Sequence, residues 1–169
     1  MRPRNLILLA LLILLGAGCK ADSAAGRAAE TIRSAFSPAP LPPDTIPEML
    51  VYAADLQVDV SEMARLPEGV LWIDLAPGEG AEVTAGDSVE VGLTGWLPDG
   101  LKVDSTATAL RVGLGQVIAG LDLGIPGMKP GGRRQLVIPP GLAFGSEGGD
   151  NIPPNAVLVY VVELRAKVP

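Results

Sequence analysis

The chain has 169 residues and a formal net charge of −6, with no histidine and a single cysteine. The acidic balance argues against a nucleic-acid partner and gives no basic patch for anionic lipid. The lack of histidine excludes Ser-His-Asp and Cys-His catalysis and nearly every zinc site, so we expect no metal and no cofactor. One cysteine leaves no internal disulfide, so stability must come from a hydrophobic core.

Residues 1–18 have the pattern of a targeting segment. Arg2 and Arg4 supply positive charge, residues 6–15 are apolar, and small residues precede Cys19. This apolar run is too short to span a bilayer, which needs about 20 residues. The pattern resembles a bacterial lipoprotein signal, which predicts that Cys19 is acylated and becomes the first mature residue. The alternative is a plain secretory signal that leaves Cys19 as a free thiol.

The residue after the cysteine bears on where an anchored protein would reside. Lys20 stands there rather than Asp, which resembles the outer-membrane sorting signal of Gram-negative lipoproteins. We therefore expect a protein of the cell envelope, held to the outer membrane by a lipid on Cys19 and facing the periplasm.

Residues 19–47 are predicted to be the acylated cysteine and an Ala- and Pro-rich tether. Residues 27–36 fit either a short helix or a frayed stretch, and we prefer the second. Five prolines between residues 38 and 47 forbid a continuing helix and favour an extended spacer. Residues 48–68 form a lead-in segment without assigned chemistry, and its packing on the domain is left open.

Residues 69–169 are predicted to form one α+β domain. Strand candidates span 69–75, 88–97, 110–114, 133–138 and 157–166. The second alternates apolar and polar residues, as a half-buried strand does, whereas the last is apolar almost throughout and is expected to be covered on both faces. Apolar residues at helical spacing predict one short helix from about residue 118 to 124.

Six motifs follow one another through this domain. They read TGWLPDG at 94–100, DS at 104–105, GQVIAGL at 115–121, GMKPGGRR at 127–134, LVIPP at 136–140 and IPPNA at 152–156. In this order they resemble the FKBP-type peptidyl-prolyl cis-trans isomerases, in their bacterial lipoprotein form. The resemblance implies an antiparallel twisted sheet wrapped around one short helix and catalysis of X-Pro isomerisation. Its implied partners are proline-containing unfolded or exported polypeptides, with macrolide ligands bound weakly.

The resemblance also implies a set of site residues. It gives catalytic roles to Asp104, Phe144, Tyr160 and the backbone N–H of Ile118. The substrate-binding positions that it implies are Leu93, Val103, Leu110, Val117, Leu121 and Ile152. Taken singly, Asp104 is more typical of a turn or a helix cap, and a core position is the more typical one for Val117, Ile118, Phe144 and Tyr160.

Several of these positions depart from the family pattern. Leu121 stands where Trp is usual, Leu93 and Val103 where Tyr and Phe are usual, and Phe144 where Tyr is usual. The loop 104–110 is expected to be shortened and has no Arg to pair with the acid. The smaller side chains around the site and the missing hydroxyl at position 144 predict an activity that is lower by roughly one to three powers of ten. A non-catalytic binding or chaperone module is the alternative function.

Overall fold

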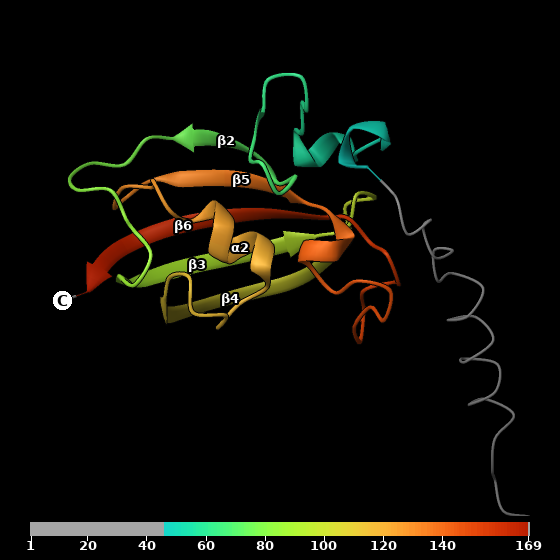
Figure 1. Cartoon of the computed structure of the whole chain (residues 1–169). Coiled ribbons are helices and arrows are strands. Elements are labelled where there is room, and N and C mark those ends of the chain that lie inside the picture. The colour runs from blue at the N-terminus through green and yellow to red at the C-terminus, as the bar shows by residue number, and fades with distance from the viewer. Residues whose placement is uncertain (1–45, 169) are drawn as a thin grey trace, which may run out of the picture. The chain divides into compact units, whose positions relative to one another are not determined.

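The computed structural model describes residues 46–168, so Cys19, the predicted signal and most of the predicted tether lie outside the described residues. Within this range six antiparallel strands form one sheet in the order β1-β2-β5-β6-β3-β4 (Figure 1). The strands are β1 (Ala64–Arg65), β2 (Leu71–Ala76), β3 (Ser88–Trp96), β4 (Lys102–Arg111), β5 (Arg133–Ile138) and β6 (Leu158–Val168). The other elements are the α-helix α2 (Ala119–Gly124) and the 3-10 turns η1 (Pro47–Met49), η2 (Ala54–Leu56) and η3 (Pro140–Leu142). The predicted α+β class with an antiparallel sheet and one short helix is confirmed.

Helix α2 lies across one face of the sheet, which we call the inner face (Figure 1). A Cβ on Gly120 would lie 2.2 Å from Ile138 Cγ2, and one on Gly124 would lie 2.6 Å from Leu136 Cδ1. Glycine at these two positions therefore lets the helix approach β5 closely. The buried inner-face cluster includes Val89, Val91, Leu93, Leu110, Leu121, Ile125, Leu136, Ile138, Leu158, Tyr160, Val162 and Leu164.

The opposite, outer face carries a second, smaller core. The segment 46–63 covers this face, where Leu56 packs with buried side chains of β2, β5 and β6. Two hydrogen bonds tie the segment down: the Ala53 N–H donates to Pro98 O at 2.8 Å, and Gln135 Nε2 donates to Leu56 O at 2.8 Å. Strand β6 thus has apolar neighbours on both faces, as its sequence predicts.

Arg134 of β5 fixes the end of helix α2 to the sheet. Its Nη1 donates to Gly124 O at 2.9 Å and to Pro126 O at 3.0 Å, carbonyls at the C-terminal end of the helix. Its Nε and Nη2 bind the two carboxylate oxygens of Asp74 at 2.6 and 3.2 Å. The guanidinium carbon lies 4.1 Å from the centroid of the Trp72 ring. These contacts satisfy a buried cation and hold a helix that is too short to be stable alone.

The sequence-based prediction for strand β4 is wrong in its extent. The strand runs over Lys102–Arg111, so only two residues of the predicted 110–114 strand belong to it, and 104–110 is not a loop. From Asp104 to Arg111 each residue pairs in register with β3, without a bulge. Gly113 and Gly115 then turn the chain with φ of +79° and +69°, values that glycine adopts without strain.

Candidate functional site

Three neighbouring strands bring Tyr160 and Asp104 together. Gly95 of β3 pairs with Tyr160 of β6 on one side and with Asp104 of β4 on the other. A Cβ on Gly95 would lie 2.6 Å from Tyr160 Cζ, so the ring lies over the glycine. The phenol thereby crosses β3, and its hydroxyl donates to Asp104 Oδ2 at 3.2 Å.

Thr106 supplies a second hydroxyl to the same carboxylate. It lies two residues after Asp104 on β4 and therefore on the same face, and its Oγ1 donates to Asp104 Oδ1 at 2.8 Å. Each carboxylate oxygen thus accepts one hydroxyl. Sequence reasoning missed Thr106 because it treated 104–110 as a loop, in which the alternation of side chains carries no information.

The phenol of Tyr160 stays protonated over a wide pH range. Its side chain is buried, and this burial raises the pKa of Tyr160 well above its ordinary value of 10. The charge of Asp104 and the hydrogen bond to it raise that pKa further. Tyr160 therefore remains a donor to Asp104 at neutral pH.

Most of the predicted wall residues meet in one apolar cluster around this pair. Leu93, Leu110, Leu121 and Tyr160 are buried members of the inner-face cluster. The partly buried side chains that pack against it include Val103, Val117, Ile118 and Ile152. The cluster therefore joins side chains of β3, β4, α2 and β6, and Ile152, from the loop that precedes β6, packs against it.

Phe144 is the predicted residue that lies outside this cluster. Its side chain is 38% exposed, and its ring lies 3.4 Å from the position that a Cβ on Gly149 would take. It belongs to a loop closed by backbone hydrogen bonds, in which Gly149 N–H donates to Ile152 O at 2.8 Å. The ring of Phe144 is therefore partly open to solvent beside this loop.

The loop before α2 presents the backbone of Ile118. Asp122 accepts the N–H groups of Gly113 at 3.0 Å and Gly115 at 2.7 Å, which ties the loop to the helix. Ile118 is the N-cap of α2, and its carbonyl accepts from Leu121 N–H at 2.9 Å. Among residues 46–168 its own N–H has no acceptor. We call Asp104, Thr106, Tyr160 and the free N–H of Ile118 the Asp104 site.

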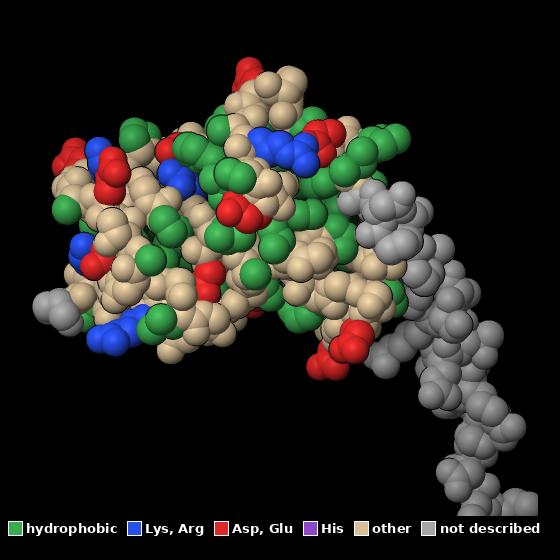
Figure 2. Space-filling view, viewed as in Figure 1, with side chains coloured by type: hydrophobic (Ala, Val, Ile, Leu, Met, Phe, Trp, Pro, Cys, Tyr) green, Lys and Arg blue, Asp and Glu red, His purple; other side chains and the backbone are tan. Residues whose placement is uncertain are grey.

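The described residues hold no group of three or more His, Cys, Asp or Glu side chains that could bind a metal ion. No helix within residues 46–168 is long and apolar enough to cross a membrane. On the inner face, Figure 2 shows Lys and Arg in separate spots among Asp and Glu rather than in one basic patch.

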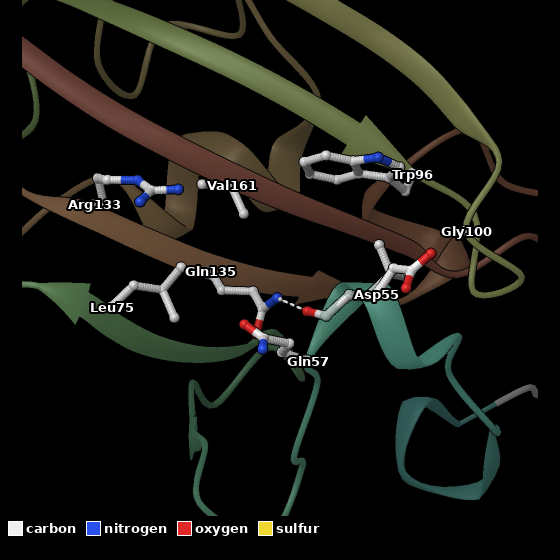
Figure 3. Close-up of a pocket in the computed structure, with 9 residues that line it drawn as sticks. Asp55, Gln57, Leu75, Trp96, Gly100, Arg133, Gln135 and Val161 are labelled. Carbon is white, nitrogen blue, oxygen red and sulfur yellow. Dashed lines mark hydrogen bonds between the residues drawn. The ribbon is translucent and has the colours of Figure 1, made fainter.

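A hollow of about 330 Å³ lies away from the Asp104 site, on the outer face of the sheet (Figure 3). It opens between η2 and the strands, with Asp55 and Gln57 on one side and Trp96 and Arg133 on the other. The Gln135 amide that binds Leu56 O forms part of its lining. Its mixed polar and apolar lining does not single out a reaction.

Residues 79–165 match the protein family described as FKBP-type peptidyl-prolyl cis-trans isomerase. The chain belongs to this family. An FK506-binding protein of Neisseria meningitidis serogroup B is 43% identical over 102 residues, which cover 57% of this chain and 94% of that protein. The chain is accordingly an FKBP-type isomerase, of a family that binds proline-containing polypeptides and FK506-type ligands.

Solved structures agree with this FKBP assignment. The peptidyl-prolyl cis-trans isomerase of Pseudomonas syringae pv. tomato superposes with a TM-score of 0.59 at 35% identity, covering 69% of this chain and 87% of that one. FkpA from Escherichia coli superposes with a TM-score of 0.58 at 35% identity, covering 63% of this chain and 52% of that one.

Proposed function

We propose that this FKBP-type isomerase assists the folding of exported proteins at the cell envelope, anchored by a lipid on Cys19 and working at a reduced rate. The observation that supports its site is the hydrogen bond from Tyr160 to Asp104 beside an aliphatic cluster, together with an N–H on Ile118 that has no acceptor within residues 46–168. The order of Arg2, Arg4, an apolar run, small residues and Cys19 supports the envelope role.

The reaction needs neither a nucleophile nor a metal. Rotation about a peptide bond faces a barrier of about 18–20 kcal/mol, set by amide resonance. The planar amide is the more charge-separated form, so apolar surroundings that remove water from it favour the twisted form. In this proposal Leu93, Leu110 and Leu121 surround the substrate proline, with Val103, Val117 and Ile152 beside them.

The polar groups of the Asp104 site orient the substrate. The N–H of Ile118 donates to a substrate carbonyl and fixes the prolyl bond against the apolar surface. Asp104 interacts with the twisted amide, and its carboxylate is held in place by Tyr160 and Thr106. The hydroxyls of Tyr160 and Thr106 thus orient the Asp104 carboxylate, as an arginine paired with it would. Phe144, from its loop, closes the site in this proposal.

The reduced rate follows from the side chains that surround the proline. An aromatic side chain buries about 150–250 Å², so Leu121 in place of Trp gives a looser proline site. Phe144 lacks a hydroxyl whose hydrogen bond contributes about 0.5–1.5 kcal/mol. Together these changes correspond to roughly one to three powers of ten in rate.

A gain of function tests the reduced rate. Phe144→Tyr restores the hydroxyl on an exposed ring, so we expect kcat/KM for an X-Pro peptide to rise roughly two- to tenfold. Trp96→Tyr, which places a tyrosine on the outer face, is a control away from the site and should leave the rate unchanged. No gain in Phe144→Tyr, in a protein as stable as the wild type, contradicts this explanation of the weakened rate.

Mass spectrometry and cell fractionation test the anchor. Wild-type protein should carry a diacylglyceryl group on Cys19 and sediment with membranes, whereas Cys19→Ser should stay soluble. Soluble, unmodified wild-type protein contradicts the anchor and favours the plain secretory signal.

A further inference from the structure

Strand β4 leaves one of its sides unpaired. It is the outermost strand of the sheet, and in Figure 1 it forms the lower edge. Within residues 46–168 it pairs with β3 alone. An unpaired strand edge presents a row of N–H and C=O groups to any chain that adds to it.

The direction of each backbone group follows from one hydrogen bond. Arg111 N–H donates to Gln116 Oε1 at 2.6 Å, so it points away from β3. Residues alternate along an antiparallel strand, and from Asp104 to Arg111 the pairing is regular. Ser105, Ala107 and Ala109 therefore direct their N–H and C=O groups outward.

This edge lacks the features that commonly block strand addition. Every side chain from Ser105 to Ala109 is exposed, and the five residues include neither proline nor a charge. Beside the edge lies a hollow of about 220 Å³, bordered by Glu90, Arg165, Ala107, Thr108 and Ala109. The small alanines leave space there for side chains of an added strand.

The edge is continuous with the Asp104 site. Val103 packs against the inner-face cluster, and Asp104 is held by Tyr160, so the first residues of β4 belong to the site. Ala109 lies five residues further, roughly 17 Å along the strand. A polypeptide with its proline at Asp104 can therefore lay four to six flanking residues along β4.

We propose that the free edge of β4 binds an extended client segment, next to the isomerised prolyl bond, as an added strand. The inference rests on the proposed use of the Asp104 site by polypeptide substrates. The clients in this proposal are unfolded chains, whose backbone amides are free to pair with β4. Backbone hydrogen bonds do not depend on the side chains of the client, so this mode of binding suits an enzyme that acts on many polypeptides.

Substrates of two lengths test this proposal with the full chain in detergent. The short one is the peptide Ala-Ala-Pro-Phe. The long ones extend it on either side by six alternating Thr and Val residues. We expect about tenfold higher kcat/KM for one of the long peptides, the gain from a few backbone hydrogen bonds. N-methylation of alternate amides in that extension should abolish the gain without any change to the enzyme.

A proline substitution tests the edge itself. Because the Ala107 N–H points outward, Ala107→Pro removes a donor from the edge and leaves the ladder to β3 intact. It should abolish the preference for the long peptide while keeping the rate on the short one. Ala107→Val keeps the N–H and should keep the preference. An unchanged preference in Ala107→Pro and with the N-methylated peptide overturns the proposal.

Two further outcomes are distinguishable. If wild-type protein sediments as a dimer and Ala107→Pro as a monomer, the edge is occupied by a second copy and the client proposal fails. If neither the wild type nor any variant isomerises the short peptide, the proposed chemistry of the Asp104 site fails. Amide hydrogen exchange then tests separately whether the edge of β4 binds the long peptide. Slower exchange at Ala107 and Ala109 with the long peptide supports the proposal, and unchanged exchange overturns it.

Discussion

Removal of the Tyr160 hydroxyl tests how the acid of the site is held. Tyr160→Phe keeps the ring over Gly95 and deletes the donor to Asp104 Oδ2. A hydrogen bond to a charged group contributes about 1.5–3 kcal/mol, and Asp104 keeps Thr106 and access to water, so we expect the lower end of this range. The free energy of unfolding should fall by about 1–2 kcal/mol and kcat/KM for an X-Pro peptide about tenfold.

The other tyrosine of the chain is a matched control. Tyr52 donates to Pro47 O at 2.7 Å on the outer face, and burial raises its pKa as it does for Tyr160. Tyr52→Phe should lower stability by about 1 kcal/mol and leave kcat/KM unchanged. Equal activity of the two variants, measured by peptide isomerisation alongside urea unfolding, refutes a role of the Tyr160 hydroxyl in catalysis.

The raised pKa of Tyr160 adds a pH dependence. Its folded-state pKa lies above the ordinary value of 10, so the stability that the phenol contributes is complete below pH 10 and is lost as the pH rises further. Tyr160→Phe should therefore flatten the alkaline loss of stability, measured by urea unfolding from pH 9 upward. The same slope of stability against pH in the wild type and the variant contradicts the assignment of this loss to the buried phenol of Tyr160.

Three further substitutions probe the fold around the site. Gly95→Ala forces a Cβ to within 2.6 Å of the Tyr160 ring and should lower the free energy of unfolding by about 1–3 kcal/mol, together with kcat/KM. Arg134→Lys loses the bidentate pair and one helix carbonyl, so urea unfolding should show a loss of about 3 kcal/mol. In Asp87→Asn the loss of stability between pH 4 and about pH 2 should flatten. Lys167, together with hydrogen bonds from Thr84, lowers the pKa of Asp87 to about 2, so the contribution of this carboxylate is lost as the pH falls through that range.

Each of these predictions has a control in the chain. At Gly92 the nearest atom to a new Cβ is the flexible Arg165 Nη2 at 3.4 Å, so Gly92→Ala should be tolerated. Arg133→Lys changes an exposed pair with Glu163 and should cost less than 1 kcal/mol. Lys167→Met removes only one of the partners of Asp87 and keeps the two hydrogen bonds from Thr84, so it should flatten the acid limb less than Asp87→Asn does. Equal losses at Gly92 and Gly95, or at positions 133 and 134, contradict the packing described above.

The strands that sequence predicts well are those with a strong pattern. Strand β3 alternates apolar and polar residues, and β5 begins after a turn of Pro130 and two glycines. Strand β6 is apolar from Leu158 to Val162 and alternates with charged residues after that. Strand β4 lacks such a pattern. Ser-Thr-Ala-Thr-Ala at 105–109 places threonines on one face and serine and alanines on the other, so no large apolar residue marks either face. Its pairing with β3 decides the structure there, and that information lies in another part of the chain.

The site, too, is only partly predictable from the sequence. The resemblance pointed to Asp104 and Tyr160, but their hydrogen bond joins residues 56 positions apart and depends on Gly95 lying between them. Thr106 has no sequence signal until its strand is known. The sequence likewise leaves the packing of the lead-in segment open, because Leu56 and Met63 pack on strands from distant parts of the chain.

The most direct test of the central proposal is the rate of X-Pro isomerisation by three proteins: wild type, Asp104→Ala and Asp55→Ala. Asp55 lines the hollow on the outer face, so its variant makes the same change of charge away from the Asp104 site. We predict measurable catalysis by the wild type, an equal rate for Asp55→Ala, and a loss of at least tenfold for Asp104→Ala in a folded protein. An unchanged rate in Asp104→Ala, or a loss confined to Asp55→Ala, would contradict the proposal that Asp104 and its two hydroxyl partners form the active site.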